Sequence, residues 1–519
     1  MRSKYILGLL SAGLIGILAQ GCGSDAEDDG TGGTGAAGSG TGATGNTTGS
    51  TMTTSSGGGP STGGSGGMGD GNDSFEEAEE IEVGVLDGGS GTIDPWESDQ
   101  DFFKFTGTED QLLLIFGNAK PDTNEFEDGY VDLVITLYDA DKNVIAVNDD
   151  PIPRSSQDSE LLTRLPSAGT YYLVVEEFCG WSSDPCPSDY DISTPDYTLT
   201  VAELDPASSS VVLHDESVVE NTPLKYGKNM DMTAYFTTIV SGEYTDADDV
   251  DVYSFNVPVD VPCDLTTMET CVAMAAAGEE RTTANFEIFP TGVTGNGSSV
   301  PTGNVWITTA ADPTTKISQV DGSKTDPTFG LTLQAPITFG TEYLVHVAAP
   351  VGATVGANPF YFLIHYGSGS NPLEAEVAGD ANNTVATAED MESAMTTGGG
   401  LGYFVAGTLT VAASLTEVDY FKFDNGQMTG TEVLFATCSA QRSGSGLRGL
   451  KLSILDGTGN VIQAATPETA EDETAFGDAG MVIPPNTTTM YLKVESTVAP
   501  STEITSRFYQ CGLAFGEPG

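Results

Sequence analysis

Acidic residues with a fixed spacing occur three times in this chain, and their types are the ones best suited to chemistry. Each copy reads acid, any residue, Asp, any residue, aromatic, any residue, Phe, and the copies span Asp99–Phe105, Asp249–Phe255 and Glu417–Phe423. Alternation with a period of two is typical of a half-buried strand, so the aromatic and the Phe should point into a core. The two acids lie at the strand entrance, and we expect both at its rim, close to solvent or to a cation.

The sequence around each copy repeats as well. A Gly precedes each acidic strand, with an apolar side chain two residues after it, and these glycines are Gly91, Gly242 and Gly407. Apolar strands follow each copy, and we call the last strand of each unit its closing strand. The predicted closing strands cover 197–201, 360–365 and 508–515. Three such units predict three similar β domains. In the middle unit we assign residues 286–292 to a hairpin-like segment and treat 291–327 as an insertion.

The composition after Asp73 supports an all-β fold. Short runs of Val, Ile, Leu, Phe and Tyr alternate with Gly, Pro, Asn and Asp, and long amphipathic helical patterns are scarce. We therefore predict tandem antiparallel β-sandwiches, each long enough for its own core. The predicted segments are a signal peptide at 1–21, a lipidated Cys with a tether at 22–72, and sandwiches at 73–205, 206–370 and 371–519.

The first residues have the features of an export signal. Arg2 and Lys4 precede an apolar run over 6–18, which is too short to favour a spanning helix. The run ends in Ala19-Gln-Gly-Cys22, which resembles the lipobox of bacterial lipoproteins with its usual Leu one position early. We expect an exported protein anchored in the membrane by a lipid on Cys22, and the lack of Asp after this Cys favours the outer membrane or cell surface. The alternative is an ordinary signal peptide.

The segment that follows Cys22 has the composition of a flexible tether. Residues 23–72 are rich in Gly, Thr and Ser and contain almost no large apolar side chain. Such a segment cannot bury enough surface to offset the entropy lost on ordering. Its reach as a random coil is roughly 40 Å.

The charge of the chain argues against one class of partner. The sequence has 18 Lys and Arg against 75 Asp and Glu, with a formal net charge of −57 at pH 7. This balance disfavours binding to nucleic acid or to anionic membrane faces. It suits an extracellular protein that stays soluble and attracts divalent cations.

Six cysteines besides Cys22 are distributed two to each predicted sandwich. An exported protein meets oxidising surroundings, so we expect disulfides within each unit. The expected pairs are Cys179 with Cys186, Cys263 with Cys271, and Cys438 with Cys511. A metal–thiolate site is disfavoured because the chain has no Cys-x-x-Cys spacing.

Several motifs together resemble a known family. Asn72–Ala78 opens the first unit and Asp380–Thr384 opens the third, while the first unit also contains Leu137-Tyr-Asp139 and Gly169–Tyr172. With the acidic strands, these motifs are similar to the bacterial pre-peptidase C-terminal domain. The resemblance implies a small jelly-roll-like β-sandwich of the kind often appended to secreted proteases. It covers nearly all of the first unit and much of the third, whereas the second lacks the opening motif.

The same resemblance implies candidate calcium ligands, because some family members bind calcium between the opening segment and the acidic strand. The implied ligands are Asn72, Asp73, Asp99 and Asp101 in the first unit, and Asp380, Asn382, Asn383, Glu417 and Asp419 in the third. Calcium prefers about six to eight oxygen ligands, which these residue types supply. Asp and Asn at strand entrances are also common turn formers, and both interpretations stay open. Asp139–Asn143 has acid spacing like that of an EF-hand but lacks its Gly and closing Glu, so we expect a hairpin turn.

Nothing in the sequence predicts a catalytic site. The histidines are His214, His346 and His365, and the last two lie within apolar runs, so they are expected in strands. The chain has no His-Glu-x-x-His motif, and no activated Ser or Cys motif accompanies the histidines. We expect a non-catalytic surface protein that binds or displays, with an unrecognised secreted hydrolase or protease accessory subunit as a further alternative.

One loop favours a second hypothesis, an adhesin that binds glycans or matrix proteins. Trp181 lies between Cys179 and Cys186, so a disulfide would close the loop around an aromatic ring. Flat rings stack well on sugars and peptides, which makes an extracellular polysaccharide or protein the expected ligand. The commoner fate of such a Trp is to pack against its own sandwich.

Overall fold

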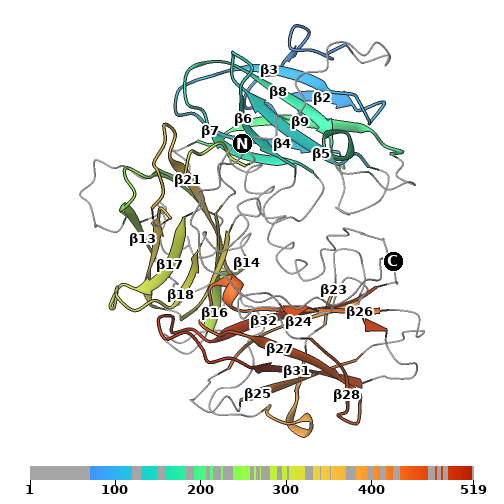
Figure 1. Cartoon of the computed structure of the whole chain (residues 1–519), viewed down its shortest axis with the longest axis vertical. Coiled ribbons are helices and arrows are strands. Elements are labelled where there is room, and N and C mark those ends of the chain that lie inside the picture. Colours follow the sequence, from blue (N-terminus) through green and yellow to red (C-terminus); the bar gives the residue numbers. More distant parts are fainter. Residues whose placement is uncertain are drawn as a thin grey trace, which may run out of the picture.

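The computed structural model is an all-β protein whose strands form three sandwiches arranged along an arc (Figure 1). The residues that the structure describes are 71–119, 130–149, 158–182, 192–205, 211–213, 224–225, 238–256, 262–264, 269–270, 281–288, 295–300, 303–321, 331–338, 340–350, 352–369, 382–391, 393–395, 401–409, 417–424, 433–465, 474–475, 481–482 and 489–516. Residues 1–70, which include the predicted signal, Cys22 and all but the last two residues of the predicted tether, lie outside these ranges. Within them, no helix has the length and apolar character needed to cross a membrane.

The first sandwich pairs two sheets, and we call the sheet with the acidic strand the front sheet and its partner the back sheet. The front sheet has the order β1-β3-β8-β5-β6 and the back sheet β2-β9-β4-β7. All pairs are antiparallel except β1 with β3. The strands are β1 (Glu79–Glu80), β2 (Gly89–Thr92), β3 (Asp101–Gly107), β4 (Leu112–Asn118), β5 (Leu133–Tyr138), β6 (Val144–Asn148), β7 (Glu160–Arg164), β8 (Gly169–Glu177) and β9 (Asp196–Glu203).

The second sandwich repeats this order and adds one strand, β10, at the edge of its back sheet. Its front sheet is β11-β13-β20-β17-β18 and its back sheet β10-β12-β21-β16-β19. The strands are β10 (Val211–Leu213), β11 (Leu224–Lys225), β12 (Thr238–Glu243), β13 (Val250–Asn256), β16 (Arg281–Ile288), β17 (Asn304–Thr309), β18 (Ser318–Asp321), β19 (Leu331–Thr338), β20 (Glu342–Ala348) and β21 (Phe360–Gly369), with a separate hairpin of β14 (Pro262–Asp264) and β15 (Glu269–Thr270).

The third sandwich has the same plan. Its front sheet is β22-β25-β31-β27-β28, and its back sheet is β23-β24-β32-β26-β29 with β30 also paired to β26. The strands are β22 (Glu389–Asp390), β23 (Ser393–Met395), β24 (Leu401–Thr408), β25 (Val418–Asp424), β26 (Val433–Ser439), β27 (Leu450–Leu455), β28 (Val461–Ala465), β29 (Thr474–Ala475), β30 (Met481–Val482), β31 (Thr489–Ser496) and β32 (Phe508–Gly516).

The middle sandwich differs from the sequence assignment in one respect. β16 lies beside the closing strand β21, the place that β4 and β26 occupy, so residues 286–292 do not begin a hairpin. The hairpin partners are β17 and β18, which fall inside the segment interpreted as an insertion. That segment therefore contains β17 and β18, two regular strands of the front sheet. The extra residues before β17 displace this hairpin in the sequence, so its equivalence to the hairpins of the other units was not recognised.

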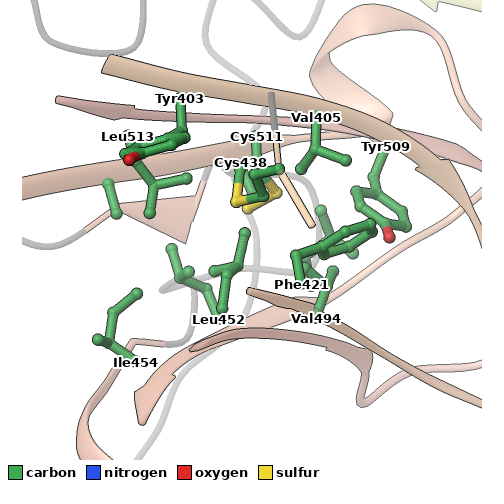
Figure 2. Close-up of a cluster of buried hydrophobic side chains, with 14 of the residues drawn as sticks. Tyr403, Val405, Phe421, Cys438, Leu452, Ile454, Val494, Tyr509, Cys511 and Leu513 are labelled. Atoms are coloured by element: carbon green, nitrogen blue, oxygen red, sulfur yellow. A yellow bond between two sulfur atoms is a disulfide. The ribbon is translucent and has the colours of Figure 1, made fainter. Parts of the chain in front are cut away.

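Each sandwich encloses a core formed by alternate residues of its strands. Phe103, Phe255 and Phe421 are 0%, 1% and 0% exposed, as the period-two pattern predicted. The third core also contains the Cys438–Cys511 disulfide, which joins neighbouring strands β26 and β32 with a Cα–Cα distance of 4.1 Å (Figure 2). This confirms the predicted pair. Cys179 is also disulfide-bonded, whereas Cys186 and Cys271 lie outside the described residues and the side chain of Cys263 is not described.

The first and second sandwiches meet through apolar faces of their back sheets. One buried cluster combines Leu114 and Phe116 of β4 with Phe360 and Phe362 of β21. At its side, the Arg164 guanidinium binds Asp110 of the first sandwich and Glu243 of the second, with N–O distances of 2.5 and 2.9 Å. The first and second sandwiches are therefore joined mainly by buried apolar side chains, as in the core of each sandwich.

The second and third sandwiches meet mainly through backbone groups. The amide of Gln319 in β18 donates to the carbonyl of Gly444, at 2.9 Å. The amides of Thr505 and Ser506 donate to the carbonyls of Lys316 and Ile317, at 2.9 and 3.0 Å. Gly444 follows the short 3-10 helix η5 (Gln441–Ser443). The third sandwich thus occupies the free edge of β18.

Candidate functional site: a buried inter-sheet aspartate in each sandwich

The second acid of every repeat is buried in the core. Asp101, Asp251 and Asp419 are 0%, 4% and 0% exposed. The prediction that both acids of each repeat lie at the rim is therefore wrong for these three. Since a buried carboxylate is costly unless hydrogen-bonded, each must find donors inside the sandwich.

A tyrosine on the closing strand supplies one such donor in each sandwich. The Tyr197 hydroxyl donates to Asp101 Oδ2 at 2.6 Å, and the Tyr509 hydroxyl donates to Asp419 Oδ2 at 2.7 Å. In the second sandwich Tyr361 donates to Asp251 Oδ2 at 2.5 Å. The acid lies on the front sheet and the tyrosine on the back sheet, so each bond fastens the two sheets together. Hydrogen bonds to a charged group contribute about 1.5–3 kcal/mol.

The repeated glycines make room for these bonds. Gly91, Gly242 and Gly407 lie directly opposite the closing tyrosines in the back sheets. A Cβ added to Gly91 would come within 2.0 Å of Asp101 Oδ2, and one on Gly242 within 2.2 Å of the Tyr361 hydroxyl. The Gly that precedes each acidic strand is therefore part of the same arrangement, a Gly–Tyr–Asp set that occurs once in each sandwich.

The second sandwich adds more tyrosine hydroxyls to this arrangement. The Tyr253 and Tyr361 hydroxyls are 2.5 Å apart. Because Tyr361 donates its one proton to Asp251, Tyr253 must donate to Tyr361. Burial and the neighbouring Tyr253 and Asp251 raise the pKa of Tyr361 well above its ordinary value. Burial and the charges of Asp251 and Asp249 likewise raise the pKa of Tyr244.

In the first and second sandwiches, the first acid of the repeat serves the preceding turn. Asp99 Oδ2 accepts the amide of Asp94 at 2.7 Å. Asp249 Oδ2 accepts the amide and hydroxyl of Thr245 at 2.8 and 3.0 Å. These are the bonds of turn-forming carboxylates, which the sequence left open as an alternative to calcium. The EF-hand-like segment is a hairpin turn, in which Asp139 Oδ1 accepts the amides of Asp141 and Asn143.

The remaining calcium candidates differ in their burial and in their position relative to the acidic strands. Asn72 and Asn382 occupy matching positions, since their carbonyls accept the amides of Phe102 and Tyr420, the residues after the buried acids. Both are buried, whereas Asp73 is exposed. Asp380 lies outside the described residues. Within the described part of the chain, no group of three or more His, Cys, Asp or Glu side chains is close enough to share a metal ion.

The third sandwich differs from the first at the buried asparagine of the opening segment. The Asn382 side chain is 3% exposed, and among the described residues neither its Oδ1 nor its Nδ2 has a hydrogen-bond partner. Asn383 Oδ1 accepts the backbone amide of Val418 at 3.3 Å. This bond holds the Asn383 side chain at the entrance of β25, where Glu417 precedes Val418. The Asn382 carbonyl accepts the amide of Tyr420, so this residue lies along the strand that carries Asp419. Amide and carboxylate oxygens are ligands that calcium prefers.

Trp181 is partly exposed at the surface of the first sandwich. It ends the short helix α2 (Phe178–Trp181), whose Glu177 cap accepts the amide of Gly180 at 3.1 Å. The Trp181 side chain is 41% exposed, and it is the one aromatic residue among the exposed large hydrophobic residues of the described chain. Its ring lies 6.1 Å from that of Phe178. The rest of its loop, residues 183–191, lies outside the described residues.

The histidines of the described chain lie in strands, as predicted. His365 is fully buried and stacks on Phe286 with ring centroids 4.3 Å apart, and burial lowers its pKa to about 3. His346 stacks on Trp306 at 4.9 Å, and burial followed by the charge of Lys316 lowers its pKa to about 4. Both rings are neutral at pH 7. His214 lies outside the described residues.

Sequence analysis did not identify the tyrosines that hold the buried acids. The signal was present, because Tyr197-x-Leu199, Tyr361-x-Leu363 and Tyr509-x-Cys511 begin the three closing strands. Aligning the closing strands on these tyrosines, and pairing them with the repeated Gly, would have pointed to a contact between sheets.

Comparison with known proteins identifies no relative by sequence. No family model matches the chain, and no curated protein is similar to it. Among solved structures, the tandem CBM51 modules of a family 98 glycoside hydrolase from Streptococcus pneumoniae align over 53% of this chain and 83% of theirs, with 10% identity and a TM-score of 0.15. The CUB1-EGF-CUB2 fragment of human MASP-1/3 aligns over 54% of this chain and 99% of its own, with 10% identity and a TM-score of 0.14. Scores this low carry no argument about function.

Proposed function

We propose that this chain is a non-catalytic, lipid-anchored surface protein whose β-sandwiches bind or display. The observation that carries the proposal is the use of the repeated acids. The sequence positions best suited to chemistry are occupied by buried aspartates bonded to tyrosines, and by carboxylates that cap turns. Residues committed to holding a scaffold in this way are not available to a substrate.

The anchor and the location rest on the N-terminal sequence. A lipid on Cys22 and a tether of roughly 40 Å would hold the sandwiches clear of an outer-membrane surface. Labelling cells with a radioactive fatty acid tests this, since label should enter the native protein and be absent from a Cys22→Ser variant. Equal labelling of the two proteins would contradict lipidation at this position.

We assign the sandwiches to the pre-peptidase C-terminal domain family as part of this proposal. The opening motifs and the acidic strands support the assignment, and the common strand order of the three sandwiches fits tandem copies of one domain. Members of that family accompany proteases, so an accessory role beside a secreted enzyme is compatible with it.

Calcium is proposed for the third sandwich rather than the first. Asn382, Asn383, Glu417 and Asp419 would contribute the protein oxygens, because the buried Asn382 amide is unpaired within the described part of this sandwich. Bound calcium would stabilise the folded third sandwich. Thermal unfolding with calcium and with chelator should show a calcium-dependent rise that Asn382→Leu removes. A ligand at about 100 times its dissociation constant adds about 2.7 kcal/mol. No shift with the native protein would reject calcium.

A glycan- or matrix-binding role is the second candidate, favoured by the exposure of Trp181. An exposed indole fixed by a short helix and a disulfide-bonded neighbour is preorganised for stacking on a sugar or peptide. Trp181→Ala should abolish retention on immobilised polysaccharides that retain the native chain. Leu86→Ala, at another exposed apolar side chain of this sandwich, is the matched control. Unchanged retention of Trp181→Ala would reject this role for the loop.

A further inference from the structure

The outer edge of the first sandwich is covered by the second. We call outer edge the last strand of each front sheet together with the last strand of its back sheet, which in the first sandwich are β6 and β7. The Thr163 hydroxyl of β7 donates to the carbonyl of Asn296 at 2.8 Å. Gly297 lies against β6, so closely that a Cβ there would be 3.0 Å from the Ile145 carbonyl oxygen. Asn296 and Gly297 belong to the segment between β16 and β17 of the second sandwich.

The outer edge of the second sandwich is covered by the third in a corresponding way. Gly444, in the segment between β26 and β27, accepts the amide of Gln319 in β18 and lies against Leu333 of β19. β26 holds the same place in its sheet as β16. At both junctions, therefore, the outer edge of one sandwich is covered by the segment that follows β16 or β26 in the next sandwich. At the second junction the backbone bonds of Thr505 and Ser506 reinforce this contact.

The outer edge of the third sandwich has no such cover from the described chain. β28 ends its sheet, and among the described strands it pairs with β27 alone. Charged residues and proline usually protect native edge strands from pairing with another chain. The sequence of β28, Val-Ile-Gln-Ala-Ala, contains neither. Val461 is 58% exposed, more than any other large hydrophobic residue described. In Figure 1, β28 lies at the outer side of the third sandwich, away from the other two.

We propose that this edge receives the first sandwich of a second copy of the chain, so that copies join head to tail. The two internal junctions show what covers such an edge, namely the next sandwich of the same type. Backbone bonding to an open strand edge is a recurrent mode of recognition. The contact joins two different surfaces and not one surface with its own copy, so it builds a series of oligomers larger than a dimer. Copies with a net charge of −57 repel one another, and association therefore strengthens as salt screens them.

Sedimentation velocity over a wide range of protein concentration, at low and high salt, tests the proposal. The full chain should carry Cys22→Ser, so that no acyl group drives association. At high salt its average mass should rise with concentration and pass that of a dimer. In parallel, hydrogen exchange of the β28 amides should slow as the mass rises, because strand addition protects them.

The variant Val461→Lys with Ala464→Lys places two charges on exposed positions of β28 and should abolish the rise in mass. Leu213→Lys, at another exposed apolar side chain in the second sandwich, is the matched control and should associate like the parent protein. An unchanged melting temperature shows that each variant is folded. A constant monomer mass at every salt concentration, a dimer that does not grow, or equal association of the double variant would each overturn the proposal.

Discussion

The second sandwich joins its two sheets through more hydroxyl groups than the first and third do. Tyr253 stands where the other sandwiches have Phe103 and Phe421, and its hydroxyl extends the bond between Tyr361 and Asp251 into a chain of three groups. The Gly–Tyr–Asp set is constant, while the side chains around it vary. A hydroxyl added beside the buried acid is therefore compatible with the core when it can donate toward that acid.

A second added hydroxyl shows the limit of this tolerance. Tyr244 stands where the other sandwiches have Ile93 and Leu409, and it is 1% exposed. Its hydroxyl has no hydrogen-bond partner among the described residues. The same core thus contains one tyrosine hydroxyl that contributes to the fastening of the sheets and one that carries only a desolvation cost.

The disulfide gives the largest expected contrast between the sandwiches. Where the third has Cys438 opposite Cys511, the second has Ile288 opposite Leu363. Replacing both cysteines by alanine should lower the stability of the third sandwich by about 4 kcal/mol, because the bond closes a long loop in the unfolded chain. Hydrogen exchange of β26 and β32 amides measures this loss, and exchange in β16 and β21 should stay unchanged. Equal loss in both sandwiches would show that they unfold together.

The glycine of the Gly–Tyr–Asp set should be nearly as sensitive. Gly242→Ala would push a methyl group into the Tyr361 ring and hydroxyl, with a cost of about 3 kcal/mol from overpacking and the displaced bond. Gly512→Ala is the control, because its Cβ would meet nothing within 4 Å. Exchange rates in β12 and β21 report the effect. A Gly242→Ala protein as stable as its parent would contradict the claim that a glycine is needed here to leave room for the Tyr361–Asp251 bond.

Alkaline pH should weaken the second sandwich more than its neighbours. The pKa values of Tyr244 and Tyr361 are raised in the folded state. Above about pH 10 the unfolded chain releases protons that the folded chain keeps, so the free energy of unfolding falls by up to about 1.4 kcal/mol per pH unit for each group. Urea titrations from pH 9 to pH 11 should show this slope, and Tyr244→Phe should reduce it. An unchanged slope in that variant would contradict the titration of Tyr244.

The sequence was sufficient to predict the acidic and closing strands of the outer sandwiches, because period-two patterns such as Phe103–Phe105 survive without tertiary information. It was less informative in the middle sandwich, where the residues before β17 shift the alignment of the hairpin. The burial of Asp101 and Asp419 could not be predicted from local pattern. It depends on a tyrosine that lies 96 residues away in the first sandwich and 90 away in the third, and on the space left by a glycine on the opposite sheet.

The most direct test of the buried acids as inter-sheet fastenings is a matched pair of hydroxyl deletions in the second sandwich. Tyr361→Phe removes the bond to Asp251 and the acceptor for Tyr253, and should lower stability by about 1–3 kcal/mol. Tyr244→Phe removes an unpaired hydroxyl and should be neutral or stabilising. Hydrogen exchange of the β20 and β21 amides measures the stability of the second sandwich in both variants. Opposite or clearly unequal effects are predicted, and equal losses in the two variants would contradict the assignment of Asp251 as a fastening between the sheets.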